Sequence, residues 1–200
     1  MKRHIFSVLI LLTSLTVAYP QTSGENATTV KGENFAEYIL KAEEGDASSM
    51  RLVGTCYQYG AGVKKDEFEA LKWYGKAALQ GDSESEYYIG VFYRDGIAVE
   101  QSDTEAAYWF RKAGANGNDK AMVNIARMFS EGRGVLQDDK IAAEYYWRAA
   151  QRGNPEGMYA YACRLRDGKG VKKNPAKAKE YFLMAAEKNY KDFAQQAAKL

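Results

Sequence analysis

Glycine recurs at a constant interval of 36 residues along most of this chain, at positions 45, 81, 117 and 153. The four units that these glycines open, 45–80, 81–116, 117–152 and 153–188, align without an insertion or a deletion. Self-similarity at one period of this length is typical of a solenoid, in which each unit packs only against its neighbours. The chain is therefore expected to be a stack of equivalent units rather than one globular core.

The first half of each unit has the apolar pattern of a helix. In the first unit Val53 and Tyr57 follow a small residue, Ser49, at four-residue steps, and this spacing lines one helix face. A glycine then follows and is expected to end the helix, because only glycine adopts a positive φ without steric cost. These glycines are Gly60, Gly96, Gly132 and Gly168. One further position is always small and would let a partner helix approach closely: Gly54, Gly90, Ala126 and Ala162.

The second half of each unit begins with a residue that favours a helix N-cap. These residues are Asp66, Ser102, Asp138 and Asn174. In the first two units Glu69 and Glu105 follow three residues later and predict a reciprocal capping box. An aromatic pair stands in the middle of each segment and is interpreted as core: Trp73-Tyr74, Trp109-Phe110, Tyr145-Tyr146 and Tyr181-Phe182. Each unit is thus predicted to be a helix-turn-helix hairpin, which makes the fold all-α.

The segments outside the four units predict other roles. Residues 1–18 combine a basic start, an apolar stretch and small residues up to Ala18, the pattern of a cleaved signal peptide. The apolar stretch, of about 13 residues, is too short to span a bilayer. Residues 19–32 are polar and are expected to be a disordered leader, while 33–44 and 189–200 match half-repeats that would cap a solenoid over 33–200. We therefore expect an exported protein, periplasmic or secreted, without stable membrane insertion.

Charge and composition exclude several functions. Loss of Lys2 and Arg3 with the signal peptide lowers the 28 basic residues to 26, which equals the 26 acidic residues. A neutral chain lacks the basic field of nucleic-acid-binding proteins. His4 is the only histidine, so the mature chain also lacks the commonest general base and metal ligand. We expect no nucleic-acid partner, no cofactor, no metal site and no catalytic residue.

The motif of the first unit resembles that of the Sel-like repeats, relatives of the tetratricopeptide repeats. The matching residues are Gly54, Tyr57, Gly60, Gly62, Val63, Asp66, Ala70, Trp73, Tyr74, Lys76, Ala77 and Ala78. The sequence departs from the motif at Ala98, where a second loop glycine is expected, and at Gly114, where an alanine is expected. The resemblance implies a right-handed α/α superhelix of four 36-residue hairpins with partial repeats at both ends. It also implies an adaptor, and exported bacterial members act in envelope assembly, in host interaction or in neutralising a secreted toxin.

The two cysteines lie three units apart, at Cys56 and Cys163. At roughly 10 Å per helix layer they would be about 30 Å apart, whereas a disulfide needs Cα atoms within about 7 Å. Both thiols are expected to be free, with Cys56 buried and Cys163 nearer the surface.

A partner-binding groove is expected on the concave side of the superhelix, formed largely by the first helices. Positions six, ten and thirteen after each repeat glycine lie opposite the core positions. The candidate contact residues are Arg51, Tyr87, Val91, Arg94, Val123, Arg127, Tyr159 and Arg166. Tyr and Arg are enriched at binding hot spots, exposed valines would need a reason, and the arginines predict a partner with an acidic surface. The alternative is a solvated helix face that happens to carry arginines.

Three classes of function stay open. The favoured one is a monomeric scaffold or adaptor, not an enzyme, that binds a protein partner through the groove. The second is a periplasmic immunity or inhibitor protein that neutralises a secreted toxin enzyme, for example a lipase effector. The third is an enzyme acting on cell-wall material, for which Glu84, Glu86 and Asp95 are candidate carboxylates although they form no recurrent inward pair.

Overall fold

A computed structural model describes residues 34–188, in which nine α-helices and no β-strand occur. The helices are α1 (Phe35–Glu43), α2 (Ala47–Tyr59), α3 (Glu67–Leu79), α4 (Ser83–Asp95), α5 (Asp103–Ala115), α6 (Asp119–Glu131), α7 (Asp139–Gln151), α8 (Pro155–Asp167) and α9 (Pro175–Glu187). The pairs α2–α3, α4–α5, α6–α7 and α8–α9 form one hairpin per unit, and α1 precedes them. This confirms the prediction of an all-α solenoid. The predicted signal peptide (1–18), leader (19–32) and closing cap (189–200) lie outside the described residues.

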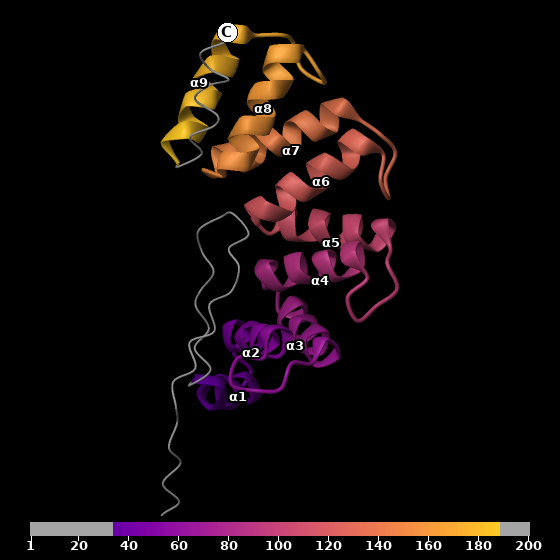
Figure 1. Cartoon of the computed structure of the whole chain (residues 1–200), viewed down its shortest axis with the longest axis vertical. Coiled ribbons are helices and arrows are strands. Elements are labelled where there is room, and N and C mark those ends of the chain that lie inside the picture. The colour runs from indigo at the N-terminus through magenta and orange to yellow at the C-terminus, as the bar shows by residue number, and fades with distance from the viewer. Residues whose placement is uncertain (1–33, 189–200) are drawn as a thin grey trace, which may run out of the picture.

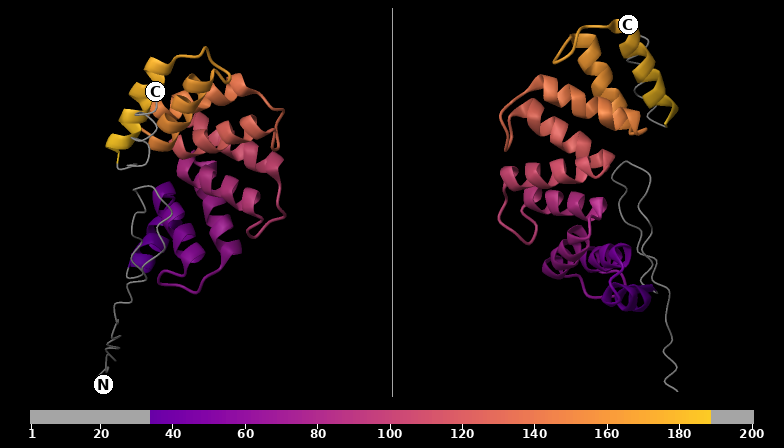
Figure 2. Two further views of the ribbon diagram at one scale, coloured as in Figure 1. Left: turned by 45° about the horizontal axis from the view of Figure 1, so that its top comes forward. Right: turned by 180° about the vertical axis from the view of Figure 1, so that it is seen from behind.

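The hairpins stack in chain order along a curve. Figure 1 shows α1 at the bottom and α9 at the top, with both ends of the stack turned toward the same side. The loops that join α4 to α5 and α6 to α7 project on the opposite, convex side, as both further views in Figure 2 also show. Consecutive hairpins pack through the second helix of one and the first helix of the next, as in α5 with α6 and α7 with α8.

The ends of the helices follow the local sequence, with one correction. Gly60, Gly96, Gly132 and Gly168 cap the first helices in the left-handed region, at φ of 73°, 68°, 69° and 72°. The side chain of Asp66 accepts hydrogen bonds from the backbone N–H groups of Phe68 and Glu69, and the other three predicted N-caps act in the same way. Each first helix is also capped, by Asp46, Asp82, Asn118 or Asn154, which the sequence pattern did not single out.

The reciprocal half of the capping box does not form. The backbone N–H groups of Asp66 and Ser102 donate instead to the carbonyl oxygens of Tyr57 and Tyr93, at 2.9 Å each. The tight loop brings the last turn of the first helix over the N-cap residue, so the N–H that Glu69 was expected to bind is already taken. Glu69 instead forms an ion pair with Lys72.

Each hairpin closes where a small residue of the first helix meets an aromatic ring of the second. A Cβ atom on Gly54 would lie 2.8 Å from ring atoms of Tyr74, and one on Gly90 would lie 2.7 Å from Phe110. Both rings are fully buried. The predicted close approach of the two helices is therefore confirmed, and the aromatic side chains form the core of the hairpins.

The loops contact the preceding hairpin through backbone, which makes their second glycine important. A Cβ atom on Gly134 (φ 66°) would overlap the backbone carbonyl of Asp103 in the preceding unit, and one on Gly170 would overlap that of Asp139. At the equivalent position of the second unit, Ala98 keeps the left-handed conformation at φ 57°. The loop geometry is thus retained even where the sequence departs from the repeat motif.

We expect Gly134→Ala to destabilise the protein more than Gly153→Ala. Both glycines have positive φ, but a Cβ on Gly153 meets no atom within 4 Å. The Gly153 variant should lose about 1 kcal/mol of unfolding free energy, the cost of a Cβ atom at positive φ. The Gly134 variant should lose about 2–4 kcal/mol, because overlap with the backbone of the preceding hairpin is added. Urea unfolding followed by circular dichroism measures both values. Equal losses for the two variants would show that the loop does not touch the preceding hairpin.

Candidate partner-binding surface

The eight candidate residues lie on the first helices of the hairpins, but their side chains are not equally accessible. Arg127 is exposed. Six others are half-buried: Arg51, Tyr87, Val91, Arg94, Tyr159 and Arg166. We call these seven residues the first-helix surface. Neighbouring helices of this surface are linked by side chains about thirty residues apart, as in the hydrogen bond from Arg94 Nη1 to Asn124 Oδ1 at 2.9 Å.

Val123 does not belong to this surface. Only 2% of the residue is exposed, so the expectation of an exposed valine was wrong. Val123 is part of the core cluster that includes Met158 and Tyr161 of α8, and Tyr159 packs against the same cluster. The physical reason is the curvature of the stack, which brings α8 into contact with α6. A position opposite the core of its own hairpin is thereby covered by the next one.

The four arginines of the first-helix surface all have carboxylate partners within the chain. Two pairs join consecutive units: Arg51 Nε lies 3.4 Å from Asp82 Oδ2, and Arg127 Nη2 lies 2.5 Å from Glu156 Oε1. The other two arginines bind the next residue in a bidentate manner, Arg94 to Asp95 and Arg166 to Asp167, at 2.7–2.9 Å. The guanidinium groups hold the pKa of both aspartate carboxyls below the usual range, chiefly through these hydrogen bonds.

The tyrosines of the surface are anchored by other rings. The Tyr87 ring lies 5.5 Å from the Tyr88 ring and 5.9 Å from that of Phe110, and Lys120 Nζ lies 5.9 Å above it. The Tyr159 ring lies 5.4 Å from that of Phe182. Burial raises the pKa of both phenols, so they stay neutral and can donate hydrogen bonds well above neutral pH. Rings held in place in this way lose little conformational entropy when a partner binds.

Glu86 carries a buried charge that was not predicted from the sequence. Glu86 is fully buried, although the equivalent residue of the other three units is methionine (Met50, Met122 and Met158). Its carboxylate accepts hydrogen bonds from Asn116 Nδ2 at 2.9 and 3.1 Å, and Lys112 Nζ lies 3.1 Å away. The departure from methionine was visible in the alignment of the units, but its partners became known only from the fold.

The groups considered for catalysis are held in structural contacts. Glu84 forms an ion pair with Lys120 at 3.6 Å, and Glu86 and Asp95 have the basic partners given above. Both cysteines are free, Cys56 buried and Cys163 half-buried, as predicted. Burial raises the pKa of the Cys56 thiol to about 11, which disfavours the reactive thiolate. Among residues 34–188 no group of three His, Cys, Asp or Glu side chains could hold a metal ion.

A curved stack of helical hairpins that presents tyrosines and paired arginines on its first helices defines the class: an α-solenoid repeat protein. The Sel1 repeat family model matches residues 47–82, 83–118, 119–154 and 155–190, each unit beginning two residues after the register defined by the glycines. The chain therefore belongs to the Sel1 repeat family. Proteins of this family are protein-interaction scaffolds, typically without enzymatic activity.

Solved structures share this fold. A protective antigen of uropathogenic Escherichia coli is 31% identical, with a TM-score of 0.78 over 82% of this chain and 35% of its own. A Sel1 repeat protein of Oxalobacter formigenes is 29% identical, with a TM-score of 0.72 over 78% of this chain and 62% of its own. An immunity protein of Pseudomonas aeruginosa is similar in fold alone, at 20% identity and a TM-score of 0.56 over 82% of this chain and 60% of its own. The chain thus spans about a third of the first relative and less than two thirds of the others. No curated protein matches the sequence.

We expect Lys112→Met to destabilise the protein, because it leaves the buried Glu86 carboxylate with only an amide partner. Lys112 is partly exposed, so the loss should be about 1–3 kcal/mol. The variant Glu86→Met introduces the residue of the other three units and should be neutral or stabilising. In the double variant the cost of Lys112→Met should largely disappear. Urea unfolding of the four proteins completes the cycle, and additive effects would show that the two side chains do not interact.

Proposed function

We propose that this protein is an exported scaffold that binds a protein partner across the first-helix surface. The observation that carries the proposal is the run of accessible tyrosine and arginine side chains along α2, α4, α6 and α8. These residue types dominate binding energy at protein interfaces. Val91 adds a half-buried apolar contact between them, and Val123 no longer contributes because it is buried.

An acidic surface on the partner fits the charges of this chain. The Arg127–Glu156 pair is about half exposed on both sides, and such a pair contributes only about 0–1 kcal/mol. A carboxylate of the partner can therefore replace Glu156 at little cost. The last unit, 153–188, contains eight basic and four acidic residues, so its net positive charge would draw an acidic partner toward Arg166.

The place of action is proposed from the first residues of the sequence. The pattern over residues 1–18 supports cleavage after Ala18 and export to the periplasm or the exterior. The helices of residues 34–188 include none with the length and apolarity that a bilayer crossing requires. Mass spectrometry of the protein recovered from a bacterial host measures this directly. A mature chain that still begins at Met1 would contradict export by this route.

A narrower form of the proposal is a periplasmic immunity protein that binds a toxin enzyme. Two immunity proteins of Pseudomonas aeruginosa share the fold at 20% and 23% identity, a likeness that extends to the fold alone. This form requires that the partner be an enzyme and that binding abolish its activity. Co-expression with the toxic enzyme encoded nearest to it, for example a lipase, would test for protection of the host cell.

We expect charge reversal at Arg127, but not at Arg148, to weaken partner binding. Arg148 on the second helix α7 is a matched control, because its ion pair with Glu144 has the same N–O distance, 2.5 Å, and similar exposure. A photoreactive p-benzoylphenylalanine in place of Tyr159 reports the partner as a covalent adduct in cells. Arg127→Glu should lower the adduct yield about tenfold, because the new carboxylate would face an acidic group of the partner. Arg148→Glu should leave the yield unchanged. Equal yields for the two variants would contradict binding at the first-helix surface.

A further inference from the structure

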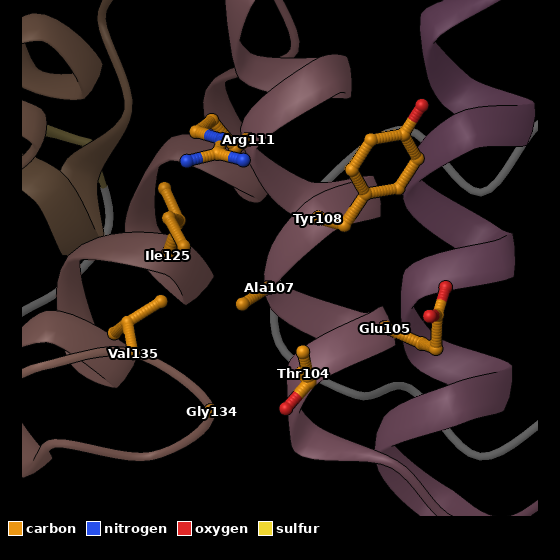
Figure 3. Close-up of a pocket in the computed structure, with 8 residues that line it drawn as sticks. All are labelled: Thr104, Glu105, Ala107, Tyr108, Arg111, Ile125, Gly134 and Val135. Carbon is orange, nitrogen blue, oxygen red and sulfur yellow. The ribbon is translucent and has the colours of Figure 1, made fainter.

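A cleft of about 470 Å³ opens between the second and third hairpins, away from the first-helix surface. Figure 3 shows it between α5 and the loop that follows α6. Arg111 stands at one end of the cleft, Thr104 and Gly134 at the other, and Ala107 lies at the centre. Val135, which is half-buried, gives the cleft an apolar wall, Ala107 and Ile125 beneath it are buried at 3% and 0% exposure, and Tyr108, about half exposed, stands at its rim. Its volume is within the range of pockets that hold small ligands or single side chains.

Three residues that line the cleft each differ from the equivalent residue at one neighbouring joint. Ala107 stands where the first unit has Leu71, which packs in the same core cluster as Ile89 and Val99. Arg111 and Ile125 stand where the next joint has the larger Trp147 and Tyr161. A second cleft lies at the joint of the first two hairpins. It is lined by residues 65–68 and Ala98, and Leu71 is not among its lining residues. The first joint thus has a larger residue at the position of Ala107, and the third joint, where Ala143 is equally small, has larger residues at the positions of Arg111 and Ile125.

Charged side chains of both signs line the cleft, Arg111 and Glu105, both on α5. Arg133, on the loop that forms the wall, is held by Asp103, with Nη2 2.7 Å from Oδ1. Arg111 forms no hydrogen bond or ion pair with the described part of the chain, and its guanidinium lies at one end of the cleft (Figure 3). A cation next to a partly apolar cavity attracts a carboxylate, and more strongly when the rest of the ligand excludes water.

We propose that this cleft is a second docking site, which binds a peptide segment of a partner protein that carries an apolar side chain followed by an acidic residue. The apolar side chain lies between Val135 and Tyr108, next to Ala107, and the acidic residue pairs with Arg111. Such an anchor in a pocket beside one charge pair is how short segments obtain specificity. The site does not depend on the proposed first-helix surface, and it would give the scaffold a second partner-binding face.

The test uses blocked dipeptides as probes and residues of the sibling units as variants. Acetyl-Leu-Asp-amide is titrated into the ¹⁵N-labelled protein, and acetyl-Leu-Asn-amide and acetyl-Ala-Asp-amide are the matched controls. We expect the first peptide to shift the amide resonances of Ala107, Arg111 and Val135 with a millimolar Kd, and each control to bind at least several-fold more weakly. Ala107→Leu, which copies Leu71, should abolish these shifts while the melting temperature stays near that of the wild type.

Arg111→Gln keeps the cleft open and removes only the charge, so it remains informative if Ala107→Leu fails to fold. In this variant the Asp and Asn peptides should bind equally. Arg127→Glu should leave all peptide affinities unchanged, which separates this site from the first-helix surface. The proposal is overturned if the Asp peptide causes no shifts around the cleft, or if it binds Arg111→Gln as tightly as the wild type.

Discussion

Close contact between a small residue and an aromatic ring holds each hairpin together, and the rest of the structure depends on it. Because Gly54 and Gly90 have no side chain, the buried rings of Tyr74 and Phe110 lie directly on the backbone of the first helix. Ala126 and Ala162, both fully buried, occupy the same place in the third and fourth hairpins. This contact sets the distance between the two helices. It thereby also determines where the loop turns and which helix faces receive the next hairpin.

The surface properties of this protein come from departures from the repeat, while the repeat itself provides the frame. Glu86 replaces a methionine and binds Lys112 of the following helix and Asn116 at the C-cap of that helix. Ala107 stands where the first unit has Leu71, and it lines a cleft. Ala98 replaces a glycine and still adopts its φ. A solenoid tolerates such changes because each unit contacts only its neighbours, so the cost of one substitution stays local.

The arginines of the first-helix surface can exchange one carboxylate partner for another. Every arginine of the first-helix surface is already paired with a carboxylate, two of them across a unit boundary. Such pairs stabilise little when they are exposed, so a binding protein can replace one carboxylate with another. Affinity would then come from the anchored tyrosine rings, and the charges would decide which partners are accepted.

The features that depend on near neighbours in the chain were predictable from the sequence. The helical hairpins, the glycine caps at Gly60 and its equivalents, the N-caps such as Asp66 and the aromatic core all follow from spacing within one unit. The burial of Val123, the partners of the arginines, the contacts of Glu86 and the cleft at Ala107 could not be read in this way. They join side chains of different helices, some about thirty residues apart, and depend on the curvature of the stack. The 36-residue period determines the helices, the caps and the aromatic core of each unit, because these depend on neighbours within the unit. Only the packing of one unit on the next decides which side chains remain accessible to a partner.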